Sequence, residues 1–497
     1  MIGVISLVYA QISSDALLLS DRSQLTTARS LSVGGAMGAL GGDMSTVNIN
    51  PAGIAIYRSS EFLLTPGLQF SSIRNTFVSD SLRPLSLNNR TAFNLGSIGL
   101  VISQELSGDW KNFNLGLSYN RIASFNRTFS FSGISTGSRL VNFVQEANNS
   151  NSIPDNLDPF EERLAWDAFL IDNPMGGTSY VGAATDSNYI RKSQLVRQSG
   201  GIGELGISLG GNYMHKLYIG GTLGINILEQ RDLRDYTETE LTGNIDFKSM
   251  RFKETRNVNG TGINLKLGMI YRLNKILRIG LAVHTPTAYS LKESYETQLS
   301  GSVIWNDSLR TTPDNNPKLS PTGQFKHNFY SPWLFNFSVG IVIGGKDAKT
   351  KGFIGVEGEY LDYSGGNFSL KATDNSATTE DQEYMNKINS AISDNYQGVA
   401  RGKFGAELSL GTFRIRTGYR LQTSPYQKEI KGVNDLRHDI SAGLGIRTDD
   451  YFVDLAYAYT INQFEYSPYY ATSEINNPRT INDLKSGLLL LTFGLRF

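Results

Sequence analysis

The chain has 497 residues, with 46 basic and 46 acidic side chains, no net formal charge and no cysteine. Zero net charge gives no reason to expect a nucleic-acid partner, and the lack of cysteine excludes disulfides, thiolate metal sites and a thiol nucleophile. No run of about 18 or more apolar residues occurs, which excludes a helical membrane protein. The 24 Tyr, 25 Phe and 51 Gly favour strands that alternate between an apolar and a polar face.

The first ten residues, 1–10, are similar to a secretory signal sequence. An apolar stretch ends in Val8-Tyr9-Ala10 and is followed by polar residues from Gln11. This is the pattern of an apolar region with a cleavage site. No basic region precedes it, which is consistent with a late or misassigned start at Met1. A short buried strand is the alternative interpretation.

Residues 11–59 show no strand-like alternation. Small side chains dominate them, and the segment includes Asn50-Pro51-Ala52-Gly53. Small residues allow one backbone to pack closely against another. The apolar content argues against a free, disordered tail. We therefore expect a compact segment that packs against the part of the chain that follows it.

Segments of alternating polarity recur from about Ser60 to the end of the chain, as expected of strands with one apolar face. The pattern predicts fourteen such strands. They cover residues 60–74, 89–104, 111–131, 200–215, 217–231, 258–273, 276–292, 323–344, 352–369, 398–410, 412–423, 435–448, 450–466 and 485–497.

The connections between these strands segregate by length. The short ones fall on one side, at Glu105–Asp109, Met214–Lys216, Leu273–Lys275, Gly344–Lys351, Gly411 and Arg447–Asp450, and the long ones on the other, at about 132–199, 293–322, 370–397, 424–434 and 467–484. Short periplasmic turns, long outer loops and an even strand count are typical of bacterial outer-membrane barrels, whereas sandwiches and propellers lack this segregation. We predict an all-β fold, a 14-stranded antiparallel transmembrane β-barrel over residues 60–497. A barrel this wide needs filling, so we expect residues 11–59 to form a hatch inside its lumen.

Strand parity separates the two faces of the wall. In the last strand the odd positions from Leu489 to Phe497 are apolar, whereas the even positions include Thr492 and Arg496. A slip by one residue would turn every side chain to the wrong face, so the register is well specified. Other predicted outward residues are Leu205, Ile207, Leu209, Ile219, Leu223, Ile225, Leu277, Ile279, Leu281, Val283, Phe335, Phe337, Val339 and Ile341.

The third strand breaks this regularity. Arg121 follows Tyr119 on the outward parity, where a basic side chain costs about 2–4 kcal/mol at the membrane midplane. A bulge or inward kink over Asn120, Arg121, Ile122 and Ala123 would resolve the conflict. The alternative is that Arg121 extends to the membrane interface. The second strand also changes phase, at Gly96-Ser97.

The second outer loop, residues 133–200, is the largest insertion. Apolar residues recur with helical spacing over 140–147 and 159–171, and Tyr384–Ile392 in a later loop predicts a further short helix. Such helices beside the barrel mouth could form an apolar capture site. The alternative is that they pack on each other and cap the barrel. The candidate capture residues are Phe160, Leu164, Trp166, Phe169 and Leu170.

Charged residues of both signs gather on the lumen parity of the ninth to thirteenth strands. Their alternation between neighbouring strands predicts cross-strand ion pairs. Two interpretations remain open: a polar wall that holds a plug or guides a charged headgroup, and a ladder of salt bridges that fills the barrel. The residues are Glu357, Glu359, Arg401, Lys403, Glu407, Arg414, Arg416, Arg420, Arg437, Asp439, Arg447 and Asp454.

A family resemblance rests on the segment before the first strand. Asn50-Pro51-Ala52-Gly53, preceded by Gly35-Ala36 and Asp43-x-Ser45-Thr46, resembles the hatch signature of the FadL/TodX (OMPP1) outer-membrane long-chain fatty-acid transporters. Residues 34–60 are most similar to Bacteroidetes-type members. The resemblance extends to the layout of a plug, fourteen strands and a terminal Phe497. It implies a hatch that closes the periplasmic end and a side opening where the third strand kinks inward.

Catalytic and metal-binding motifs are lacking. The four histidines, His215, His284, His327 and His438, form no His-x-x-x-His pair, and no Gly-x-Ser-x-Gly or clustered-carboxylate motif occurs. We therefore expect no enzyme activity, no metal and no cofactor. A haem ligand at His284, or at His327 with a tyrosine, is the alternative.

The sequence thus predicts a passive transporter, a monomer surrounded by outer-membrane lipid, that takes up hydrophobic small molecules such as long-chain fatty acids. The alternative is a haem or hydrophobic-ligand receptor, or an accessory structural barrel of an outer-membrane complex. A continuous apolar path from the outer loops to the hatch would favour transport. A lumen sealed by salt bridges would favour the accessory role.

Overall fold

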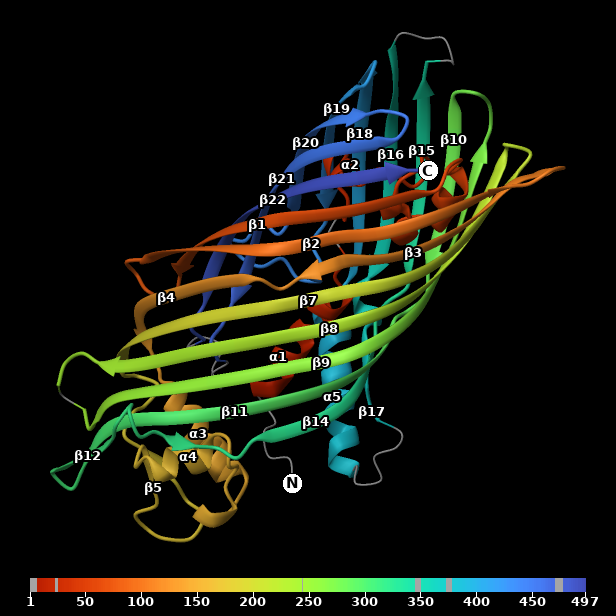
Figure 1. The fold of residues 1–497 in the computed structure, drawn as a ribbon. Coiled ribbons are helices and arrows are strands. Elements are labelled where there is room, and N and C mark those ends of the chain that lie inside the picture. The colour runs from red at the N-terminus through yellow and green to blue at the C-terminus, as the bar shows by residue number, and fades with distance from the viewer. Residues whose placement is uncertain (1–6, 23–25, 244, 345–349, 372–377, 470–476) are drawn as a thin grey trace.

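The computed structural model describes residues 7–22, 26–243, 245–344, 350–371, 378–469 and 477–497. Antiparallel strands form one closed barrel (Figure 1), in which β1 (Glu61–Phe77) pairs with β22 (Thr480–Arg496). Closure leaves no unpaired sheet edge at this seam. The predicted 14-stranded antiparallel barrel is confirmed.

The first seven barrel strands are longer at their outer ends than the sequence predicted, so the outer loops between them are shorter. In chain order the fourteen barrel strands are β1; β2 (Leu85–Glu105); β3 (Trp110–Ser124) with β4 (Arg127–Thr136); β7 (Tyr189–Tyr213); β8 (Leu217–Glu240); β9 (Phe247–Arg272); β10 (Leu277–His284) with β11 (Ala288–Trp305); β14 (Gly323–Tyr330) with β15 (Leu334–Ile343); β16 (Thr350–Asp362) with β17 (Asn367–Leu370); β18 (Gly398–Leu410); β19 (Phe413–Gln422); β20 (Arg437–Arg447); β21 (Tyr451–Tyr466); and β22.

The remaining elements lie before the barrel or in its outer loops. No helix in the described ranges is long and apolar enough to cross a membrane. The elements are α1 (Leu7–Ser20), α2 (Ala28–Ser32), η1 (Met44–Asn48), η2 (Pro51–Ile56), α3 (Arg139–Asn149), η3 (Pro154–Asn156), α4 (Glu162–Asp167), β5 (Ile171–Asp172), β6 (Val181–Gly182), β12 (Ser308–Thr312), β13 (Lys318–Leu319), η4 (Tyr363–Gly365) and α5 (Thr379–Asn395).

The predicted signal sequence, residues 1–10, falls mostly outside the described residues. Residues 7–10 form the start of α1. The signal sequence and the domain boundaries at residues 10 and 59 stay predictions.

Several barrel strands are interrupted where the sequence predicted continuous ones. The predictions of single strands over 276–292 and 323–344 were wrong at Thr285–Thr287 and Ser331–Trp333. Pro286 and Pro332 lie in these gaps, and proline cannot donate a hydrogen bond to the ladder. The ninth barrel strand turns through η4 between β16 and β17.

The outward face is apolar, as the parity predicted. Leu205, Ile207 and Leu209 of β7 are 43–47% exposed, whereas Ser208 between them is fully buried. Phe335 and Phe337 of β15 are each 52% exposed. A closed, even-stranded barrel with an apolar outer face is the architecture of bacterial outer-membrane proteins. The chain is therefore a protein of the bacterial outer membrane.

Residues 26–57, which we call the hatch segment, lie inside the barrel near the end that carries the C-terminus (Figure 1). Glycines of the barrel wall form a ring around this segment. Gly340, Gly355, Gly405 and Gly418 stand directly opposite one another on four successive strands. The other wall glycines that contact the hatch segment are Gly96, Gly99, Gly116, Gly210, Gly220, Gly268, Gly280 and Gly443.

The close approach is between backbones. A Cβ atom added at Gly405 would lie 2.3 Å from the carbonyl oxygen of Val33, and one at Gly220 would lie 2.4 Å from that of Pro51. Such distances are too short for any side chain. The ring of glycines therefore creates the space in which the hatch segment lies.

We expect Gly405→Ala to destabilise the seating of the hatch segment by about 1–3 kcal/mol, because the added methyl overlaps the Val33 carbonyl. Gly402→Ala is the matched control, since its methyl on the same strand faces outward and meets nothing within 4 Å. Heat unfolding in detergent and protease cleavage within residues 26–57 measure the effect. Equal behaviour of the two variants would contradict it.

Candidate functional site

The Asn50-Pro51-Ala52-Gly53 motif builds one turn of the hatch segment. The Asn50 side chain accepts a hydrogen bond from the Ala52 amide at 3.1 Å, which caps η2, and Pro51 occupies the first helical position. The Asn50 amide donates to the carbonyls of Gly38 at 2.7 Å and Met269 at 3.2 Å. One side chain thus joins two turns of the hatch segment to β9.

Wall side chains also hold the carbonyl groups of the hatch segment. Asn114 of β3 donates to the carbonyls of Ile54 and Tyr57 at 2.6 and 3.0 Å. Arg278 of β10 donates to the Leu40 carbonyl at 3.0 Å. These bonds satisfy buried backbone carbonyls, of which that of Ile54 also accepts a hydrogen bond from the Tyr57 amide at the end of η2.

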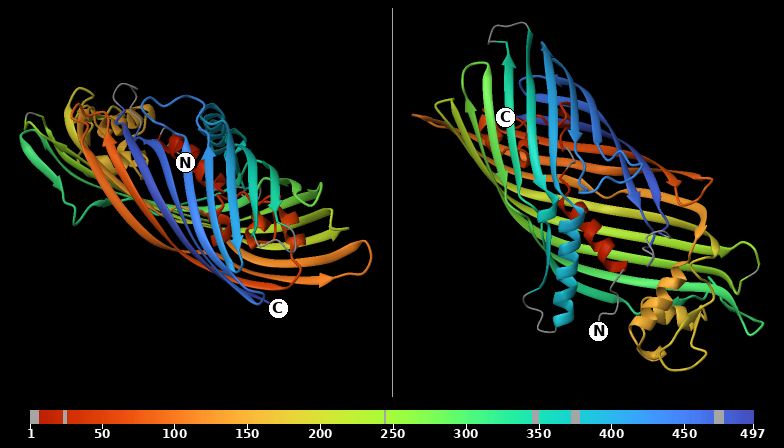
Figure 2. Two further views of the ribbon diagram at one scale, coloured as in Figure 1. Left: turned by 90° about the horizontal axis from the view of Figure 1, so that it is seen from above. Right: turned by 180° about the vertical axis from the view of Figure 1, so that it is seen from behind.

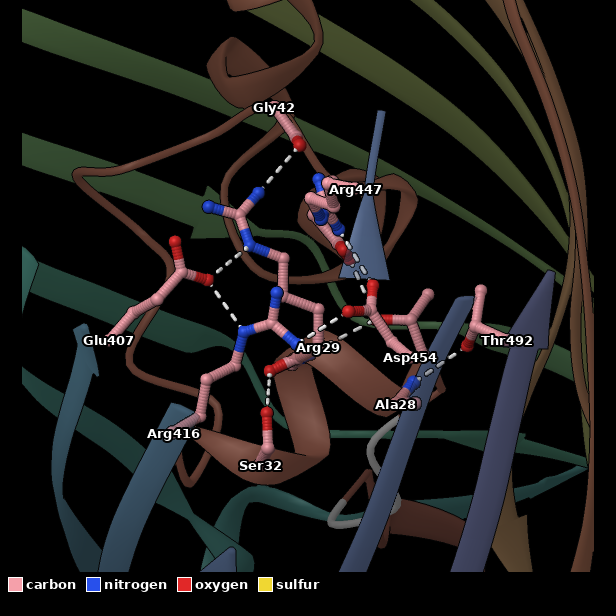
Figure 3. A network of polar contacts seen from close by, with 12 residues as sticks. Ala28, Arg29, Ser32, Gly42, Glu407, Arg416, Arg447, Asp454 and Thr492 are labelled. Atoms are coloured by element: carbon pink, nitrogen blue, oxygen red, sulfur yellow. Dashed lines mark hydrogen bonds and ion pairs between the residues drawn. The ribbon is translucent and has the colours of Figure 1, made fainter. Parts of the chain in front are cut away.

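An ionic network joins α2 to the wall (Figure 3). Arg29 contacts Glu407 of β18 at 3.3 Å, and Arg416 of β19 contacts the same carboxylate at 2.5 Å. Arg416 and Arg447 share Asp454 of β21, at 2.6 and 2.8 Å. Because each charge has an opposite partner, the network avoids the large cost of an unpaired buried charge.

A second network lies on the neighbouring strands. Lys403 bridges Glu357 and Glu359 at 2.8 and 2.5 Å, and Arg401 contacts Glu359 at 2.6 Å. Glu357 also accepts a hydrogen bond from the Gly38 amide of the hatch segment at 2.8 Å. The charges of these two networks are therefore paired across strands, and two of the carboxylates, Glu357 and Glu407, also hold the hatch segment.

Arg414 stands apart from these networks. It lies beside the β18–β19 turn and donates to the carbonyls of Gly411 and Phe413. What the lumen charges do in function stays a prediction.

The third barrel strand bends into the lumen. β2 pairs with β3 only as far as Ser97 opposite Asn120, and the β3–β7 register shifts between Arg121 and Ala123. Beyond the bend, β4 pairs with β7, while the outer half of β2 pairs with β1. The wall thus loses its backbone ladder between β2 and β4.

Side chains cross this gap in place of the ladder. Arg90 of β2 donates to the carbonyls of Gln198 at 2.5 Å and Arg127 at 3.3 Å. Asn88 accepts hydrogen bonds from the amide and hydroxyl of Ser130 at 2.7 and 3.0 Å. The gap is therefore closed by a few polar contacts.

The four residues of the predicted kink have different surroundings. Asn120 is buried and accepts a hydrogen bond from Ser97 at 2.8 Å. The Arg121 guanidinium lies over Gly201, whose added Cβ would be 2.5 Å from it. Ile122 and Ala123 are both buried, although they are consecutive. Two inward neighbours in a row are characteristic of a bulge.

An apolar cluster lies at the inner side of this bend. It contains Ile122, Ala123 and Phe125, together with Ala16 and Leu19 of α1. Helix α5 lies beside α1 (Figure 2) and contributes aromatic and aliphatic side chains to the same cluster. These are Tyr384, Met385, Ile388 and Ile392.

One ion pair anchors α1 in the lumen. Asp15 contacts Arg256 of β9 at 2.5 Å, and Glu293 of β11 contacts Arg256 through two bonds at 2.6 and 2.8 Å. Sequence analysis did not single out these three residues. The alternation along β9 and β11 indicates that Arg256 and Glu293 face the lumen, but nothing in the sequence pairs them with Asp15.

A small polar cavity of about 40 Å³ lies between the hatch segment and the wall near Ile122. Cationic side chains and Glu359 line it, and among the described residues Arg22 donates to the hydroxyls of Thr287 and Ser331. Several buried polar atoms of its lining have no hydrogen-bond partner among the described residues. They are Arg22 Nη1, Thr26 Oγ1, Ser30 Oγ, Asn48 Nδ2 and His284 Nδ1.

The candidate capture residues do not form one surface. Leu164 and Leu170 are buried in a cluster that caps inward-facing residues of the outer barrel end. Phe160 and Trp166 are half-buried, against the rings of Tyr295 and Tyr180. Phe169 is 43% exposed. A role in capture stays a prediction.

Three of the four histidines contact the hatch segment or aromatic rings, whereas His215 lies at a turn beside Asn212. The ring of His284 lies 3.2 Å from the Ile49 carbonyl oxygen, and His327 stacks against Phe325. In the described part of the chain, no three His, Asp or Glu side chains gather as a possible metal site.

Buried carboxylates mark the second outer loop. Burial raises the pKa of Asp158 to about 6, and burial together with the carboxylates of Glu161 and Asp158 raises the pKa of Glu162 to about 9. Burial also raises the pKa of Glu161 to about 7, although Arg139 contacts it at 3.1 Å. Glu162 therefore keeps its proton at neutral pH.

The chain is thus an outer-membrane barrel plugged by its own N-terminal segment, with a bend in the third barrel strand. No protein-family profile matches it, and no curated protein matches it significantly. A FadL homologue of Pseudomonas aeruginosa is similar in structure, at 12% identity over 96% of this chain and 100% of its own, with a TM-score of 0.53. Toluene transporters are also similar: TodX of P. putida (11% identity, 96% and 99% covered, TM-score 0.47) and TbuX of Ralstonia pickettii (12%, 94% and 98%, 0.45).

The likeness to the first of these structures shows a shared fold, and TM-scores below 0.5 add nothing to it. The resemblance to the FadL/TodX family is therefore confirmed at the level of the fold. The narrower assignment to Bacteroidetes-type members stays a prediction.

We expect the second outer loop to become less stable as the pH rises. An acid whose pKa is raised on folding binds its proton more tightly in the folded state, so stability is lost between its ordinary value of 4.5 and about 9. Glu162→Gln should remove much of this dependence. Hydrogen exchange of residues 139–167 at pH 6 and pH 9 measures it, with Asp155→Asn as the exposed control. An unchanged pH dependence in Glu162→Gln would refute the assignment.

Proposed function

We propose that the chain is a passive outer-membrane channel for hydrophobic small molecules, with long-chain fatty acids as the best fit. The observation that carries this proposal is the bend in the third barrel strand, where the backbone ladder stops beside an apolar cluster. A ligand in that cluster could leave sideways into the membrane, between β2 and β4. It would then never need to cross the polar hatch segment.

The inner end of this path fits an anionic headgroup. The cavity beside Ile122 is too small for a whole ligand, but four cations, Arg22, Lys266, Arg401 and Lys403, line it against one carboxylate, Glu359. The last three cations are in ion pairs, so Arg22 is the cation that would contact a headgroup. The unpartnered donors of the cavity include Arg22 Nη1 and Asn48 Nδ2. Because buried donors without partners are costly, a carboxylate there would be stabilised. This supports an amphipathic ligand with its tail in the apolar cluster.

Although the ligand does not cross the hatch segment, its release on this proposal needs that segment to move, because Ser30, Asn48 and Ile49 line the cavity that holds the headgroup. The chain has no cysteine, so an engineered disulfide can test this without background. A Cβ at Gly340 would lie 3.3 Å from that of Ala39, close to the roughly 3.5–4.5 Å of natural disulfides, and its nearest contact is the end of the Leu40 side chain. We expect oxidised Ala39→Cys/Gly340→Cys to take up labelled oleate in vesicles at least tenfold more slowly than its reduced form.

The matched control is Gly358→Cys/Gly402→Cys, a pair directly opposite each other that faces outward. It ties wall to wall and leaves the hatch segment free, so oxidation should not change uptake. Full uptake by the oxidised hatch variant would show that hatch movement is not required. No uptake by the wild-type chain would refute transport itself.

An accessory structural barrel is the second candidate. The observation that favours it is the filling of the lumen by α1 and α5, whose side chains complete the apolar cluster. On this alternative, deletion of α5 should weaken the fold without opening any path for oleate. On the transport proposal, the same deletion should speed uptake.

A further inference from the structure

A cluster of cations faces outward just beyond the membrane-facing apolar surface. Lys292 of β11 stands directly opposite Lys326 of β14, and both side chains are exposed. On the other side of Lys292, Asn259 of β9 is its direct partner. Arg231 of β8, also exposed, faces Asn257 on the same face two residues from Asn259.

The position of this cluster follows from the strand register. Ile225, Ile263, Ala288 and Tyr330 stand in one row across the four strands. Lys292 lies four residues beyond Ala288, which is about 13 Å of strand at 3.3 Å per residue. With a tilt of roughly 40°, that is about 10 Å along the membrane normal. Beyond the row the next outward residues of β9, β11 and β14 are polar (Thr261, Ser290 and Asn328), so the lysines lie past the edge of the apolar surface, at the depth of lipid headgroups and on the side of the long outer loops.

The lysine pair has no ion-pair partner among the described residues, although Glu229 of β8, exposed and opposite Asn259, lies in the same row. Within the described ranges, no carboxylate lies within 4.0 Å of Lys292, Lys326 or Arg231. Like charges directly opposite each other on a sheet are destabilising. An anion bound between the two ammonium groups would remove this repulsion.

A hollow on the same two barrel strands fits an acyl chain. It measures about 850 Å³ and is lined by Leu281 and Val283 of β10 and by Phe335 and Phe337 of β15. Its floor includes Gly358 and Gly402, where an added Cβ would meet nothing within 4 Å. Nine residues separate Val283 from Lys292, and nine separate Phe335 from Lys326.

We propose that Lys292 and Lys326 bind the phosphate group of a phosphorylated glycolipid of the outer leaflet, with an acyl chain in the hollow over Gly358 and Gly402. Arg231 and Asn259 supply further donors to the same headgroup. The site belongs to the membrane-facing surface and is independent of any path through the lumen. It would fix the depth and rotation of the barrel in the outer leaflet.

The test uses the full chain in detergent, with bisphosphorylated lipid A as the probe. We expect Lys292→Gln/Lys326→Gln to bind it at least tenfold more weakly by native mass spectrometry. Lys485→Gln is the matched control, an exposed lysine on β22 that faces Ser72 and Ile461. It should bind like the wild type.

Three further arms identify the ligand. Dephosphorylated lipid A should bind the wild type weakly, to the same extent as phosphorylated lipid A binds the double variant. The Gly402→Leu variant should bind phosphorylated lipid A more weakly, because the leucine fills the hollow. Inorganic phosphate should compete poorly. Equal binding by the double variant overturns the proposal, and equal competition by inorganic phosphate overturns the acyl-chain part. Oleate uptake should stay unchanged in the double variant, which separates this site from the proposed channel.

Discussion

Close contact between two backbones is the constraint on which the structure depends. Hatch carbonyls approach the wall so closely that a methyl group at Gly220 or Gly405 would overlap them. Such contact is possible only where the wall lacks side chains, so the ring of glycines fixes the depth of the hatch segment. At that depth Arg29 reaches Glu407, and Asn50 reaches the carbonyl of Met269.

The wall is unequal around its circumference. On the strands from β16 to β21, paired charges cross-link neighbours and the hatch segment, and removing one partner of such a buried pair costs about 3–5 kcal/mol. On the opposite side, the backbone hydrogen bonds between the second and third barrel strands stop at the bend. The side chains of Arg90 and Asn88 cross the gap between β2 and β4. The weaker side lies beside the apolar cluster. This asymmetry is the physical basis for proposing lateral exit there.

The sequence predicted which wall residues face outward, because side chains alternate between the two faces of a strand. Parity placed Leu205, Ile207 and Leu209 outward, and the count of fourteen strands was correct. Prolines 286 and 332 could have revealed two of the interruptions, since proline cannot join the ladder. Long-range pairing was beyond such reasoning. The alternation of side chains along a strand does not show that Asp15 pairs with Arg256, or that α1 and α5 fill the lumen together.

The central claim is that a hydrophobic ligand reaches the apolar cluster at the bend and leaves through the wall there. Labelling with a photoreactive long-chain fatty acid, followed by peptide mapping, tests this most directly. The account predicts labels on buried residues of the cluster, at Ile122, Phe125 and Leu19, that excess oleate removes. Labels confined to outward residues such as Leu117 and Phe335, unaffected by oleate, would contradict it.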